Sequence, residues 1–272
     1  MVRMLDGFSR AGLAFAVHIG DIKSGHSDCS DATYADRLKL LDDTPVPMVL
    51  IPGDNDWTDC NRITSGGWVP DERLAKLREI FFSRPESLGR QRMALERQPV
   101  IENGCCPENV RWWHEGILFV GLHVVGSANH RGSGQDPTPE FAARNPANIQ
   151  WLKESFAMAR NRGAPGVVLF IHANANIERV GRFHRAYVDV LETLREETVL
   201  FGRPVLLVHG DTHRFRLDRP WWQAKTSAGI PNLQRVEVPG SPTVAWVPVR
   251  VDPLAVEVFT VMAPRLAPAP PR

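Results

Sequence analysis

The chain has 272 residues, of which 43% are hydrophobic, and 32 Lys and Arg against 31 Asp and Glu give a formal charge of +1. At about 150 residues per domain this length can bury a large core, which excludes a small disulfide scaffold and a disordered chain. The near-neutral charge lacks the basic footprint of a nucleic-acid-binding protein, so no nucleic-acid partner is expected.

No apolar run reaches the roughly 18 residues needed to cross a bilayer, so no membrane span is expected. The opening segment, MVRMLDGFSRAGLAFAVHIGD, lacks the basic head, apolar core and small-residue cleavage site of an export signal. As written, the chain is therefore expected in the cytoplasm. An upstream signal segment would instead make it periplasmic or secreted, and the sequence leaves the oligomeric state open.

Four short apolar runs are each followed at once by a polar cluster. Continuous apolar runs of this length predict strands that are buried on both faces. The runs and clusters are LAFAVHI before Gly20-Asp21, VPMVLIP before GDND at 53–56, GVVLFI before His172, and PVLLVH before GDTH at 210–213.

Helices are predicted between these strands. The apolar spacing indicates helices over 33–42 and 71–82, and Asn145-Pro146 predicts the cap and first residue of a third helix. Residues 108–127 predict a pair of strands, and alternation over 236–261 predicts a second, antiparallel sheet. Strands that alternate with helices indicate a layered α/β domain, expected to span residues 1–262. Residues 263–272, APRLAPAPPR, are expected to form a disordered Pro-rich tail.

Two cysteines follow acidic motifs at the ends of neighbouring predicted strands. Cys29 lies a few residues beyond the first motif and Cys60 a few residues beyond the second. A disulfide between them and two free cysteines in loops are equally open interpretations, and a cytosolic chain would favour free cysteines.

The four polar clusters are expected to converge, because ligands of an open α/β sheet bind beyond the carboxyl ends of its strands. Carboxylates crowded at one sheet end would raise one another's pKa without a cation, which favours a metal site over four unrelated turns. The oxygen and nitrogen ligands, with no thiolate, suit Mn, Fe or Zn. The candidate side chains are Asp21, Asp54, Asn55, Asp56, His172, Asp211 and His213.

The order GD, then PGxxD, then a lone His after a strand, then GxxH resembles the calcineurin-like metallophosphoesterase superfamily. GDIKSG, PGDNDWTDC and HGDTHRFRLDRP resemble a bacterial branch of it, and the match runs from about Ala14 to the end of the C-terminal sheet. The resemblance implies a four-layer α-β-β-α double β-sandwich flanked by helices. It also implies a binuclear metal centre that hydrolyses an ester of a small phosphorylated substrate with a metal-activated water.

The resemblance assigns metal ligands position by position. Asp21 would bridge the two ions, and Asp54 would take the place of the family's metal-binding Asn. His172 would bind the second ion and His213 the first. Asp211 would stand where the family usually has its next His.

The leaving group needs a proton donor, and here the chain departs from the family pattern. Asn55 occupies the place of the family's His that assists the leaving group. Asn55 is also a candidate metal ligand, through its amide oxygen. An amide cannot donate that proton at neutral pH, so Asp56 and His26 are the further catalytic candidates.

A second departure concerns the family's first motif, an Asp-x-His at the end of the first strand. The twenty residues before Asp21 contain no such motif, so the first strand of the fold is expected to be missing. The first ion would then keep only Asp21 and His213, few for a metal that takes four to six ligands, so the expectation is two ions, with a single ion as the alternative if the motif is absent. The alternative function is a catalytically impaired or truncated relative that binds a metal ion or phosphorylated ligand without turnover.

Overall fold

A seven-stranded mixed sheet organises the chain in the computed structural model, which describes residues 2–99, 106–177, 185–220 and 229–266. The strand order is β3-β4-β5-β6-β7-β9-β8. Its central strands, β5, β6, β7 and β9, run parallel, and the outer pairs are antiparallel. The strands are β3 (Glu96–Arg97), β4 (Val110–His114), β5 (Ile117–Gly121), β6 (Val167–Phe170), β7 (Val205–His209), β8 (Arg216–Asp218) and β9 (Leu233–Glu237).

The other described strands form two-stranded pairs. β1 (Ala16–Ile19) runs parallel to β2 (Met48–Ile51) and has no second partner strand within the described residues. Two antiparallel pairs, β10 with β13 and β11 with β12, complete the set. Their bounds are β10 (Ala245–Trp246), β11 (Val249–Val251), β12 (Phe259–Val261) and β13 (Arg265–Leu266).

All four predicted apolar runs contain a strand, namely β1, β2, β6 and β7, and residues 108–127 contain the predicted antiparallel pair β4–β5. The C-terminal expectation was only partly correct. β9 joins the seven-stranded sheet beside β7, and the residues after it form the two short pairs rather than one second sheet. Of the expected tail, Arg265–Leu266 pairs as β13, and 267–272 lie outside the described residues.

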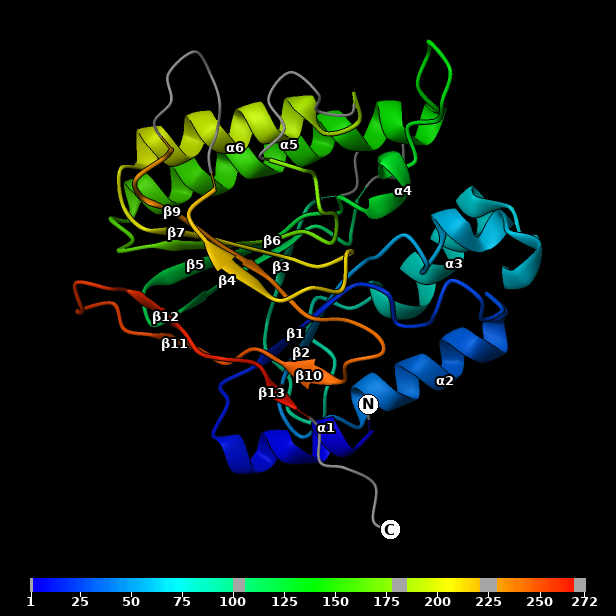
Figure 1. The fold of residues 1–272 in the computed structure, drawn as a ribbon, viewed down its shortest axis with the longest axis horizontal. Helices are drawn as coiled ribbons and strands as arrows, with labels where there is room; N and C mark the ends of the chain where they lie inside the picture. Colours follow the sequence, from blue (N-terminus) through cyan, green and yellow to red (C-terminus); the bar gives the residue numbers. More distant parts are fainter. Residues whose placement is uncertain (1, 100–105, 178–184, 221–228, 267–272) are drawn as a thin grey trace.

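The helices divide between the two sides of the sheets. α5 and α6 lie side by side over one face of the seven-stranded sheet, while α1, α2 and α3 lie beyond the β1–β2 pair (Figure 1). Three short 3-10 turns, η1 (Ser9–Ala11), η2 (Thr58–Asn61) and η3 (Ile63–Ser65), connect these elements. The helices are α1 (Val2–Phe8), α2 (Asp31–Asp42), α3 (Pro70–Phe81), α4 (Gly126–Asn129), α5 (Pro139–Asn161) and α6 (Val188–Phe201).

The predicted start of α5 was wrong. The helix begins at Pro139, capped by the Thr138 side chain, which accepts a hydrogen bond from the Phe141 N–H at 3.2 Å. Pro146 therefore lies inside the helix, where it removes one backbone hydrogen bond. Asn145 does not cap, because its amide donates to Asp189 of α6 at 2.9 Å. Burial of the helix face against the sheet outweighs the cost of the proline.

Three apolar clusters hold these elements together. One lies between the seven-stranded sheet and α5 and α6, and includes the fully buried Leu118 and Phe156. A second packs the other face of this sheet against β2 and the C-terminal strands. The third joins β2 to α1, α2 and α3. The fold is thus mixed α/β with a large central sheet, as predicted.

A search of the described helices for a long, apolar membrane-crossing segment finds none.

Candidate metal site

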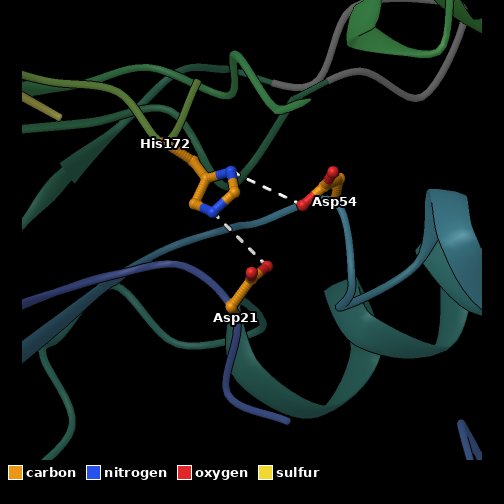
Figure 2. A group of neighbouring side chains, drawn as sticks. All are labelled: Asp21, Asp54 and His172. Atoms are coloured by element: carbon orange, nitrogen blue, oxygen red, sulfur yellow. Dashed lines mark ion pairs between the residues drawn. The ribbon is translucent and has the colours of Figure 1, made fainter. Parts of the chain in front are cut away.

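The loops after β1, β2 and β6 bring three potential metal ligands together. Asp21, Asp54 and His172 each offer one ligand atom, and these atoms lie within 4.8 Å of one another. The imidazole lies between the two carboxylates (Figure 2), with Nε2 3.4 Å from Asp21 Oδ1 and Nδ1 3.8 Å from Asp54 Oδ1. Two carboxylate oxygens and one imidazole nitrogen are a donor set that suits Mn, Fe or Zn.

Glycines before the two aspartates let the loops approach this closely. A Cβ on Gly53 would lie 2.2 Å from Asp21 Oδ1, and a Cβ on Gly20 would lie 2.5 Å from His172 Cδ2. Gly20 also has a φ of +71°, a conformation that glycine adopts at little cost. Any larger residue at either position would push the ligands apart.

The charges in the cluster act strongly on one another. Burial alone would lower the pKa of His172, but its contact with Asp21 and the charges of Asp54 and Asp211 outweigh burial and raise the pKa to about 9. Burial and the charge of Asp21 raise the pKa of Asp54 to about 6. Burial would also raise the pKa of Asp21, but the hydrogen bond and charge of His172 together with two hydrogen bonds from Asn55 outweigh burial and lower it. The metal-free site therefore holds protons that a bound cation would displace.

These pKa values predict that Mn²⁺ affinity rises with pH. A metal ion needs neutral His172, yet with a pKa of about 9 this imidazole stays protonated through neutral pH, whereas Asp54, at about 6, has already ionised. One proton per ion should be released, and affinity should rise by about tenfold per pH unit between pH 7 and 8.5. Calorimetric titration in buffers of different ionisation enthalpy measures both quantities, and a flat affinity would contradict this electrostatic account.

Asn55 and Asp56 occupy different places around the cluster. The Asn55 side chain donates to Asp21 Oδ2 at 2.7 Å, so its amide faces the cluster. Asp56 is fully buried, and it accepts the backbone N–H groups of Asp21, Ile22 and Gly53 at 2.7 to 3.0 Å. Burial and the charge of Asp21 raise the pKa of Asp56 to about 7, against the effect of these hydrogen bonds. The hydrogen bonds of Asp56 thus join the loop after β1 to the loop after β2.

Asp211 and His213 follow β7 but are not in the 4.8 Å group. Asp211 accepts the Asn174 N–H at 3.1 Å, and its Oδ1 lies beside Gly126, as does Asp54 Oδ2. His213 is exposed, and its Nδ1 lies 2.7 Å from the Ser241 carbonyl oxygen. A carbonyl only accepts, so Nδ1 is the donor in this hydrogen bond, the arrangement in which the other ring nitrogen of a histidine can bind a metal.

A cleft of about 1500 Å³ connects these residues. Its lining includes Asp21, His172, Asp211 and His213 together with apolar side chains of β1, β6, β7 and β9. All four residues of β1 line it, and all four are only partly buried. His26, the third catalytic candidate, is exposed in the loop that borders the cleft.

Sequence reasoning missed two residues that contact the cluster. The Ser127 hydroxyl donates to Asp54 Oδ2 at 2.8 Å, and the Gly126 N–H lies 3.4 Å from His172 Nδ1. Both follow the apolar residues after β5, so the signal was the same as at the other sites, a polar cluster after a predicted strand. Residues 108–127 were interpreted only as a strand pair, and this end of the segment was overlooked.

The two interpretations of Cys29 and Cys60 are resolved, because the residues form a disulfide. Both are fully buried. Cys29 lies in the segment that follows Asp21 and Cys60 in the segment that follows Asp54, so the bond joins the two loops that carry the carboxylates. The described part of the chain contains no free cysteine.

Solved structures share this fold. PhoD matches with a TM-score of 0.55 at 14% identity, over 90% of this chain and 55% of the PhoD chain, so the chain spans about half of PhoD's length. A dimetal phosphatase from Danio rerio matches with a TM-score of 0.54 at 13% identity, over 96% of this chain and 81% of that one. No known protein family and no curated protein matches the sequence. The chain therefore shares its fold with PhoD and with this dimetal phosphatase.

Proposed function

We propose that this chain is a metal-dependent phosphoesterase, a hydrolase that cleaves an ester of a small phosphorylated substrate. The observation that carries the proposal is the cluster of Asp21, Asp54 and His172 at the carboxyl ends of β1, β2 and β6. These donors fit a divalent cation, and burial and the charge of Asp21 raise the pKa of Asp54, two effects that a bound cation would offset. The likeness to a dimetal phosphatase supports the same chemistry.

In the full proposal two ions, of Mn, Fe or Zn, share the site. Asp21, Asp54 and His172 would hold one of them, and Asp21 and His213, with Asp211 nearby, would hold the other. The Nδ1–H of His213 is bound to the Ser241 carbonyl, which leaves Nε2 free to act as a ligand. The proposal places these residues in the calcineurin-like superfamily, with a domain over 1–262 and a four-layer arrangement that the three apolar clusters support.

Bound metal would supply a hydroxide at neutral pH by lowering the pKa of a coordinated water. The chain's own residues orient this chemistry. The Asn55 amide fixes the second oxygen of Asp21, so that the first faces His172. Proton delivery to the leaving group falls to His26, because the carboxylate of Asp56 is buried against three backbone amides.

The test is hydrolysis of an aryl phosphate, as monoester and as diester, by the metal-free chain before and after addition of Mn²⁺. We expect turnover only with the ion, and its loss on chelation. Equal turnover with and without metal would contradict the proposal. Turnover of the monoester, the diester or both would also define the substrate class.

A second candidate is a protein that binds a metal ion or phosphorylated ligand without turnover. Two observations favour it: the cluster among the described residues contains three ligands, and β1, which lines the adjacent cleft, pairs with β2 alone among the described strands. Tight Mn²⁺ binding with no hydrolysis of either ester would select this candidate.

A further inference from the structure

The segment α4 (Gly126–Asn129), which lies directly beside the metal site, contains a left-handed turn. Ser127, Ala128, Asn129 and His130 have φ values of +47°, +53°, +51° and +55°. L-amino acids avoid this conformation because the Cβ atom meets the following carbonyl oxygen. Four consecutive residues of this kind, none of them glycine, persist only where the surrounding structure fixes them.

Buried hydrogen bonds fix the far half of the turn. The Asn129 side chain accepts the Val125 N–H at 3.2 Å and an Arg144 N–H at 2.7 Å, and it donates to the Ala186 carbonyl at 3.2 Å. Asn129 and Arg144 are both fully buried. His130 Nδ1 lies 2.6 Å from the Thr58 hydroxyl. The turn is therefore anchored at its end away from the cluster.

Its near end presents one hydroxyl to two carboxylates. Ser127 Oγ lies 2.8 Å from Asp54 Oδ2 and 2.8 Å from Asp59 Oδ1. A hydroxyl has a single proton to donate. Because Arg62 pairs with Asp59 at 2.5 Å, the charge of Asp59 already has a partner, and the Ser127 proton is available to Asp54.

We infer that Ser127 is a positioning residue for the metal site, held against Asp54 by the strained turn. Its hydroxyl donates a hydrogen bond to Asp54 Oδ2. The other oxygen, Oδ1, faces His172 and is left to bind the ion. Ser127 itself is exposed, so the strained backbone does not serve to bury its side chain. The inference rests on the proposed metal-binding function. It implies that the left-handed turn lowers the stability of the folded chain and raises its affinity for the metal ion.

The experiment compares Ser127→Gly, Ser127→Ala and Ala128→Gly with the parent, by Mn²⁺ calorimetry and by the melting temperature of the metal-free protein. Ser127→Gly relieves strain and removes the hydroxyl, so we expect Tm to rise by roughly 2–4 °C while affinity falls about 10- to 100-fold. Ser127→Ala should lose the same affinity without the gain in Tm. Ala128→Gly, the matched control, relieves strain one residue further on and should bind Mn²⁺ within about twofold of the parent.

Opposite changes in Tm and affinity for Ser127→Gly would support the inference, because a merely structural residue would move both together. If the parent binds Mn²⁺ and both Ser127 variants bind it equally well, the inference is overturned and the proposed function stands. If the parent itself binds no Mn²⁺, both fail.

Discussion

Replacing Asp21 by Asn should abolish metal-dependent hydrolysis and weaken Mn²⁺ binding by more than about 100-fold. Asp21 Oδ1 lies 3.4 Å from His172 Nε2, and its Oδ2 accepts a hydrogen bond from the Asn55 side-chain amide at 2.7 Å. Removal of a direct ligand is expected to exceed the 10- to 100-fold cost of losing a supporting residue. Calorimetry with Mn²⁺ and aryl phosphate turnover measure the two effects.

The matched control is Asp36→Asn, which neutralises an exposed carboxylate that lines the same cleft but lies outside the cluster. It should leave affinity and turnover unchanged. The metal-free Asp21→Asn protein should remain folded, because the charge of Asp21 raises the pKa of Asp54 and its removal relieves that repulsion. Parent-level hydrolysis by Asp21→Asn would refute its role as a ligand.

Removing the disulfide should destabilise the protein by about 3–4 kcal/mol, since Cys29 and Cys60 are 31 residues apart and their bond limits the unfolded chain. For a chain of this size the loss corresponds to a fall in melting temperature of roughly 10 °C. The double variant Cys29→Ala with Cys60→Ala tests this by urea denaturation. Metal affinity should fall as well, because the bond joins the loops that carry Asp21 and Asp54.

Cys106 is also disulfide-bonded, so reduction of the parent would not isolate one bridge. The control is therefore the double variant measured with and without reductant, which gives the contribution of the remaining disulfide alone. An unfolding free energy for the oxidised variant within about 1 kcal/mol of the parent would show that the Cys29–Cys60 bond contributes little to stability.

Strands were the most readable part of the fold. β1, β2, β6 and β7 are short apolar runs that end at polar clusters, and few structures other than a buried strand produce this pattern. The start of α5 was misjudged because a proline ordinarily lies at the first position of a helix. Here the turns before Pro146 pack against the sheet, and the helix continues across the proline. α6 was overlooked although Val190, Leu191 and Leu194 are spaced for one buried face.

The site was readable where ligands follow strands directly. The structure brings together Asp21, Asp54 and His172, which follow strands of two different sheets, β1 and β2 of the parallel pair and β6 of the seven-stranded sheet, but it leaves Asp211 and His213 outside the group. Their distance depends on loop conformation after β7, which no apolar pattern encodes. Ser127 was overlooked although it follows the predicted strand pair, and its backbone gave no further signal, because residues other than glycine do not mark a left-handed turn in the sequence.

Elemental analysis of the purified chain, after incubation with Mn²⁺ and removal of free ion, measures whether the cluster of Asp21, Asp54 and His172 holds metal. We expect tightly held metal, with about two ions per chain if Asp21 bridges a binuclear centre that includes His213, and its loss in Asp21→Asn. One ion would restrict the site to Asp21, Asp54 and His172. A parent chain that retains no metal would contradict the proposed function.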